Sequence, residues 1–252
     1  MVEPSTDPDG RGVGPARLRA WWLVSGVVTV IVVGLAGILF GPADLGIGEV
    51  LTELADGLPF VDAGSGLGAR QQAIIWEIRL PRALAAFATG AALGISGAAL
   101  QGLLRNPLAE PGVLGVSASA SLFATVSIYY GLAALSPWIL PLAAILGALA
   151  ATGVIALAAI RTRSVVTLIL IGVGLSSFAG AAMSLLMNLA PNPFTLSDMI
   201  NWMLGSVANR SFRELGFTAP FLIGGAAILL ASRRGLSVLT LGEEAASGAG
   251  LD

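Results

Sequence analysis

The chain has 252 residues, of which 56% are hydrophobic and only 11% are charged, and its formal net charge is −2. Soluble domains carry about 25% charged residues, so this composition indicates an integral membrane protein. The absence of cysteine and histidine excludes disulfides, the usual zinc and haem ligands and any histidine-based catalytic triad. No basic patch exceeds two adjacent arginines, so nucleic acid is not an expected partner, and neither a metal site nor a cofactor is expected.

Long apolar runs predict an all-α polytopic membrane protein with about six crossings. A polar tail rich in glycine and proline, expected to be flexible and cytoplasmic, occupies residues 1–20. The predicted spans cover residues 21–40, 83–104, 113–130, 137–160, 165–190 and 215–231. A cleaved signal peptide competes with the first span, but the length of the run and the lack of a small-x-small cleavage site favour a retained helix. A short amphipathic segment is expected at 198–213, and a cytoplasmic segment at 232–252.

The run 83–104 is unusually rich in small residues, including Gly90, Gly94, Gly97 and Gly102. Small residues let membrane helices approach one another closely. We therefore expect this span to be a central helix packed against protein on many sides.

The distribution of arginine predicts the orientation. Six crossings put both termini on one side of the membrane. The arginines at 11, 17, 19, 105, 161, 163, 233 and 234 then share that side, and those at 70, 79, 82, 210 and 213 lie on the other. The positive-inside rule makes the terminal side cytoplasmic.

Arg79 and Arg82 stand at the expected outer mouth of the span 83–104, three residues apart and hence on one helix face. They could anchor the helix at the lipid headgroups by snorkelling. Alternatively, they could receive carboxylates of a docking protein, for which the arginine fork is well shaped. The residues alone leave both interpretations open, and anchoring is the simpler one.

Two short segments on the expected cytoplasmic side stand out. Asn106 with Pro107 and Pro111 predicts a tight turn between two helices. A short helix near Glu243 and Glu244 could be a solvated cap, or a peg that fits a soluble partner.

The predicted spans contain no charged residue, which argues against a proton- or ion-coupled carrier. Without histidine, cysteine or lysine, no nucleophile–base pair can be assembled for a membrane enzyme. The chain also lacks the G-x-x-x-x-G-K-[ST] phosphate loop of an ATPase. Energy for any transport is therefore expected to come from a partner.

Taken together, the motifs resemble the FecCD or BtuC-like family, the permeases of type II ABC importers for ferric siderophores, haem and cobalamin. The segments that carry the resemblance follow the family's order and spacing after Trp21: Arg79-Leu80-Pro81-Arg82, Gly90-Ala91-Ala92-Leu93, Ser96-Gly97-Ala98, Gln101, Arg105-Asn106-Pro107-Leu108-Ala109-Glu110-Pro111, Leu114-Gly115-Val116-Ser117, Trp202-Met203-Leu204-Gly205-Ser206 and Leu241-Gly242-Glu243-Glu244-Ala245-Ala246.

The resemblance implies a permease domain over 21–231 in a multi-pass inner-membrane protein that imports a metal chelate. It implies three partners: a cytoplasmic ABC ATPase dimer, a periplasmic or lipid-anchored substrate-binding protein, and a second permease subunit. It also implies docking of the binding protein by Arg79 and Arg82 and contact with the ATPase by residues 241–246. By the same analogy, Ser176, Ser177, Ser184 and Asn188 are candidates to line the translocation path.

Members of the family typically have ten spans, so the chain is expected to be truncated by four relative to them. A ferric siderophore is the first cargo that the resemblance implies, with haem and cobalamin as alternatives. A truncated membrane scaffold that binds partners without transporting is the alternative from another class.

Overall fold

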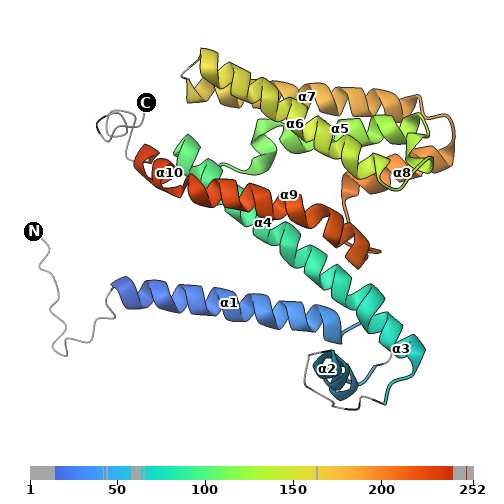
Figure 1. Cartoon of the computed structure of the whole chain (residues 1–252). Helices are drawn as coiled ribbons and strands as arrows, with labels where there is room; N and C mark the ends of the chain where they lie inside the picture. The colour runs from blue at the N-terminus through green and yellow to red at the C-terminus, as the bar shows by residue number, and fades with distance from the viewer. Residues whose placement is uncertain are drawn as a thin grey trace, which may run out of the picture. The chain divides into compact units, whose positions relative to one another are not determined.

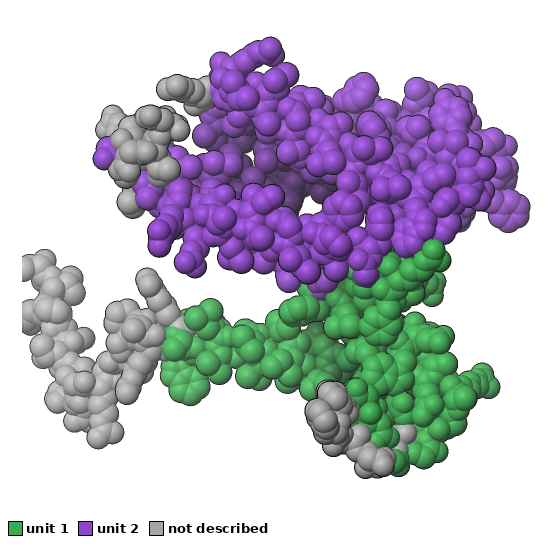
Figure 2. Space-filling view, in the orientation of Figure 1, with its two compact units in different colours: residues 1–87, 209–215 green, residues 88–208, 216–252 purple. Residues whose placement is uncertain are grey.

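The computed structural model describes residues 15–41, 43, 45–57, 64, 66–162, 164–240 and 248, with side chains from residue 20 onward (Figure 1). Every regular element within this described part is helical. The prediction of an all-α polytopic fold is therefore confirmed. The chain divides into two compact units, residues 1–87 with 209–215 and residues 88–208 with 216–252 (Figure 2).

The first unit is built around the C-terminal end of α1. It comprises α1 (Pro15–Leu39), α2 (Ile47–Asp56), α3 (Ala69–Ala73), η1 (Ile74–Arg79) and the first residues of α4 (Leu80–Leu104). Ile38, Val50 and Ile75 form its buried core, and Leu39, Leu54 and Trp76 pack around them. The acid-rich stretch that follows the first span thus contains a folded cluster, which the composition of the stretch did not predict.

The first helix begins at Pro15, earlier than the expected start at residue 21. Proline suits the first helical position because its missing N–H would have no partner there. Alanine, leucine and arginine, the residues that follow, are all good helix formers. Part of the tail that was expected to be flexible is therefore helical.

The central span also begins earlier than predicted, because helix runs without interruption from Ala69 to Leu104. The π-helical turns of η1 directly precede Pro81, and the Leu80 N–H bonds back to the Ile75 carbonyl. A proline ring inside an α-helix clashes with the carbonyl four residues earlier. The wider π-helix accommodates that ring, so Pro81 does not end the helix.

The second unit is centred on α5 (Val116–Tyr129), which packs against α6 (Ile139–Arg161), α7 (Val165–Asn188) and α8 (Pro193–Leu204). The remaining elements of this unit, apart from most of α4, are η2 (Pro111–Leu114), η3 (Leu132–Ala134), α9 (Phe212–Ala231), whose first residues belong to the first unit, and α10 (Arg233–Leu239). Five side chains of α5 are buried, namely Ser119, Ala124, Thr125, Ser127 and Ile128.

Glycine allows close backbone approach at two places in this unit. A Cβ on Gly147 of α6 would lie 2.5 Å from the Ser119 carbonyl oxygen, so α5 and α6 meet almost at the backbone. At the other place, a Cβ on Gly172 of α7 would lie 2.6 Å from Leu114 Cα. The facing Gly115 has φ of 73°, in the left-handed region that favours glycine.

Two sequence predictions need correction here. The small-residue span, α4, was expected to be the packed centre, yet of its residues in the second unit only Leu104 is buried, and its Gly90, Gly94 and Gly97 face open space. Small residues permit close packing but do not choose which helix packs there.

The span expected at 113–130 is not one continuous helix, because the left-handed Gly115 separates η2 from α5. The remaining 14-residue helix is about 21 Å long, short of the roughly 30 Å hydrocarbon core. Five described helical segments are long and apolar enough to cross a membrane by themselves, and α5, in the third predicted span, is a shorter apolar helix.

The amphipathic segment expected at 198–213 is instead α8, which begins at Pro193. Asn192 caps it, since its Oδ1 accepts a hydrogen bond from the Thr195 N–H at 2.9 Å. Pro193 thus starts the next helix directly after the end of the predicted span 165–190.

Candidate functional site

Arg79 is the most enclosed charged side chain described, with only 2% of its surface exposed. Its Nη1 donates hydrogen bonds to the carbonyls of Ile38 at 3.0 Å and Leu39 at 2.9 Å, and its Nη2 donates to the Ala43 carbonyl at 2.8 Å. The guanidinium thus closes the C-terminal end of α1. The last carbonyls of a helix have no partner within it and carry partial negative charge, so a buried cation is well placed there.

Arg82 has a different environment. It is half-buried, and its single described hydrogen bond is long, 3.5 Å from Nη2 to the Gly37 carbonyl. The two arginines that the sequence paired are therefore distinct, because Arg79 is enclosed by three acceptors and Arg82 is loosely held.

Glu53 completes the polar interior of the first unit and is 5% exposed. Its two carboxylate oxygens accept hydrogen bonds from Trp76 Nε1 at 2.8 Å and Gln72 Nε2 at 3.2 Å. This role of Glu53 was not predicted from the sequence. The spacing of Val50, Glu53 and Leu54 on a short amphipathic helix was the available signal, since it puts the carboxylate on the buried face.

The predicted turn at Asn106 is held by local hydrogen bonds. Asn106 Oδ1 accepts from the Leu108 N–H at 2.9 Å, and the Asn106 carbonyl accepts from the Ala109 N–H at 3.0 Å. Pro107 lies inside this turn, and Pro111 occupies the first position of η2, where its missing N–H costs nothing. The segment then turns back to pack against α7 through η2.

The four path candidates on α7 do not lie on one face. Ser177, Ser184 and Asn188 are exposed and share one face of the helix, with Gly174 and Ala181 between and beside them. Ser176 instead lies beside η2, where a Cβ on Gly115 would be 3.1 Å from its backbone nitrogen. Between Ser177 and Asn188 this face carries small and polar side chains, whereas Leu170 and Val173 expose apolar side chains earlier on the same helix.

The coupling candidates Leu241, Gly242, Glu243, Glu244, Ala245 and Ala246 lie outside the described residues. Within the described ranges, no cluster of three or more acidic side chains is arranged to hold a metal ion.

Residues 29–252 match the FecCD transport family. The chain belongs to the FecCD transport family. The family assignment from the sequence motifs is thus confirmed.

Several curated FecCD relatives are similar to the chain. An uncharacterized ABC transporter permease protein, YvrB of Bacillus subtilis, is 41% identical over 178 residues, covering 69% of this chain and 50% of the relative. The vitamin B12 import system permease protein BtuC of Klebsiella pneumoniae is 37% identical over 213 residues, covering 84% of this chain and 64% of the relative. The chain thus spans between half and two thirds of the length of these relatives.

The chain is also similar in fold to a solved structure, described as an inward-facing conformation of an ABC transporter of the metal-chelate type. The TM-score is 0.76 at 28% sequence identity, covering 92% of this chain and 68% of the solved chain. The fold of this chain is thus similar to that of the solved transporter over nearly all of this sequence.

Proposed function

We propose that this chain forms the transmembrane permease part of an ATP-driven importer that moves a metal chelate inward across the inner membrane, with its N-terminus cytoplasmic. The observation that carries the proposal is the family match over residues 29–252, joined to the fold shared with a metal-chelate type transporter. The low charge of the spans supports it. Arg161, the last residue of α6, is the only charged residue in that helix, and α7 contains none. An intramembrane charge is the usual sign of ion coupling.

The energy would come from partners. We propose a cytoplasmic ABC ATPase dimer that contacts residues 241–246, a periplasmic or lipid-anchored binding protein that delivers the chelate, and a second permease subunit, identical or different. The chain itself is proposed to be a transport subunit and not an enzyme.

For docking of the binding protein, we propose that Arg82 makes the direct contact and that Arg79 shapes the surface beneath it. Arg82 is half-buried with one long hydrogen bond, so turning toward a carboxylate costs little. Arg79 would have to give up three carbonyl acceptors to do the same. Hydrogen bonds to charged groups are each worth about 1.5–3 kcal/mol, so that movement is strongly opposed.

For the translocation path, the exposed face of α7 formed by Ser177, Ser184 and Asn188 is the proposed lining. Hydroxyl and amide groups on a helix that is otherwise apolar suit contact with a hydrated chelate. Ser176 is proposed to contribute to packing against η2 instead, because the two backbones meet there.

A ferric siderophore is the first proposed cargo. Cobalamin is the second, since relatives at 36–37% identity bear the name of vitamin B12 permeases. Uptake of ⁵⁵Fe-siderophore and ⁵⁷Co-cobalamin separates them, measured in host cells that lack the gene and then in cells that carry it again. We expect restored uptake of one chelate and its loss when the ATPase is inactivated.

Three other results would count against this proposal. Failure to restore either uptake, with the chain present in the membrane, would favour the non-transporting scaffold. Uptake that persists without the ATPase would favour a secondary carrier. For docking, Arg82→Glu should weaken binding of the substrate-binding protein about tenfold or more, since like charges then face each other across the interface; unchanged binding would remove Arg82 from the docking surface.

A further inference from the structure

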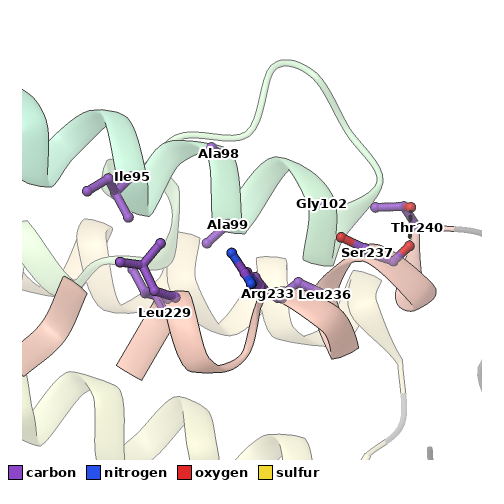
Figure 3. A pocket seen from close by; sticks show the side chains of 10 residues that line it. Ile95, Ala98, Ala99, Gly102, Leu229, Arg233, Leu236, Ser237 and Thr240 are labelled. Atoms are coloured by element: carbon purple, nitrogen blue, oxygen red, sulfur yellow. Dashed lines mark hydrogen bonds between the residues drawn. The ribbon is translucent and has the colours of Figure 1, made fainter. Parts of the chain in front are cut away.

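A groove of about 240 Å³ opens in the second unit, between the C-terminal half of α4 and the consecutive helices α9 and α10 (Figure 3). Ala98 and Ala99 of α4 form one wall, and Leu229 and Leu236 form part of the other. The short side chains of α4 create the space. The groove therefore runs along α4 beside mostly apolar side chains.

One end of the groove is polar and cationic. Arg233 lines it and reaches from α10 toward Ala99 (Figure 3). Within the part of the chain that the structure describes, the Arg233 guanidinium has no ion-pair or hydrogen-bond partner. Ser237 lies one turn further along α10 and also lines this end, where its carbonyl accepts a hydrogen bond from Thr240 Oγ1 at 2.7 Å.

The cationic end is held in place by a contact between α4 and α10. Nε of Arg105, which follows the last residue of α4, donates a hydrogen bond to the Leu239 carbonyl at 2.8 Å. Arg105 and Arg234 add two further positive charges near the same helix ends. None of the described side chains that line the groove is acidic.

The position along the helices decides what such a groove can hold. The apolar spans of α4 and α9 end at Leu104 and Ala231, so Arg233 lies just beyond the hydrocarbon region. A guanidinium binds phosphate oxygens through paired hydrogen bonds, and an apolar wall beside it suits an acyl chain. Basic pockets between membrane helices are typical sites for anionic headgroups.

We propose that this groove binds one anionic phospholipid, with an acyl chain along Ala98, Ala99 and Leu229 and the phosphate on Arg233 and Ser237. A zwitterionic lipid would fit the apolar wall equally well, but its ammonium group would lie among arginines with no described carboxylate to receive it. The proposal does not depend on which substrate the chain transports, or on whether it transports one.

The test is native mass spectrometry of the full chain released from nanodiscs that contain equal amounts of dioleoyl phosphatidylglycerol and dioleoyl phosphatidylcholine. Each arginine near an anionic lipid is worth about fivefold in binding, so phosphatidylglycerol should be retained at least about fivefold over phosphatidylcholine. Arg233→Gln should lower that retention about fivefold. The matched control Arg234→Gln, an adjacent arginine that does not line the groove, should change it less than twofold.

A second pair of variants fills the groove without changing charge. Ala99→Leu should remove the retained lipid, whereas Ala227→Leu, on an exposed position of α9 outside the groove, should leave it unchanged. If Ala99→Leu does not fold, the comparison of Arg233→Gln with Arg234→Gln, two exposed positions, still tests whether the groove binds the lipid.

Three results would overturn the proposal. Equal retention of the two lipids would remove the headgroup preference. If Arg233→Gln and Arg234→Gln lowered the retention of phosphatidylglycerol equally, the lipid would be attracted by the general positive charge of this region and not by a site in the groove. A photo-crosslinker at position 99 that attaches only to protein, and not to lipid, would show that another helix or a second copy occupies the groove.

Discussion

The two units of this chain are held together by different means. In the first, a buried arginine and a buried glutamate join α1, α2, α3 and η1 through five hydrogen bonds, three from Arg79 and two to Glu53. In the second, α6 meets α5 at Gly147 and α7 meets η2 at Gly172, with backbone atoms in close approach at both places. One membrane protein thus uses polar interaction where the chain leaves the bilayer and close backbone packing where it spans it.

The difference follows from the solvent of each region. Near the membrane surface, loops and helix ends expose carbonyls that need donors, and a long arginine side chain can reach several of them. Inside the bilayer, lipid is as apolar as leucine, so helices gain most by approaching closely. Single substitutions in each unit should separate the two means of stabilisation by the size of their effects.

Arg79→Met should destabilise the protein most, by about 3–5 kcal/mol, because three buried carbonyls lose their donor. Thermal unfolding in detergent, followed by tryptophan fluorescence, measures it. Arg82→Met is the matched control and should change stability by less than about 0.5 kcal/mol. Equal losses in the two variants would show that charge at the helix end matters more than burial.

Gly172→Ala should cost about 1–3 kcal/mol, since its new methyl group would meet backbone atoms of Leu114 that cannot move aside easily. Gly174→Ala lies two residues away on the same helix in open space, and should be neutral or stabilising by up to about 1 kcal/mol. Hydrogen exchange should show faster opening of α5 and α7 in the first variant, with α2 unaffected. Opening confined to α2 would contradict the division described above.

Glu53→Gln should cost about 1–2 kcal/mol, because an amide offers one acceptor oxygen where the carboxylate offered two. The emission maximum of Trp76 should shift as its indole N–H loses or weakens its partner. Glu49→Gln, an exposed position on the same helix, serves as the control and should change stability by less than about 0.5 kcal/mol and leave the emission unchanged, because the Gln amide oxygen can still accept the hydrogen bond from the Gly46 N–H.

Arg210→Gln should have the smallest effect, below about 0.5 kcal/mol. Its ion pair with Glu214 spans 3.2 Å, but both side chains are about 40% exposed, and exposed pairs contribute little. Thermal unfolding at low and high salt should give nearly the same midpoint for this variant and the original chain. A large loss would assign this pair a structural role comparable to that of Arg79.

The sequence predicted the membrane class, the all-α fold and most helix boundaries, because long uncharged runs and arginine-marked ends are signals within the chain itself. The boundaries of α6 and α7 lie within two residues of those predicted. The family was also predictable, since several short motifs kept a common order.

Other features depended on contacts that no local pattern contains. The split at Gly115 was invisible because glycine is common in membrane helices, and only its positive φ reveals the break. The burial of Arg79 depends on carbonyls about forty residues earlier in the chain. The three-residue spacing of Arg79 and Arg82 therefore predicted that they share a helix face. It could not predict that Arg79 is buried and Arg82 only half-buried.

The bonds from Arg79 to α1 also have a consequence for biogenesis. The donor that closes the first helix lies 41 residues after the Ile38 carbonyl that it binds. At a synthesis rate of about 5–20 residues per second, that carbonyl waits about 2–8 s for its partner on the ribosome. During that interval the end of the first helix must be solvated by water, lipid headgroups or the insertion machinery, so the C-terminal end of α1 can mature only after the next span has begun to emerge.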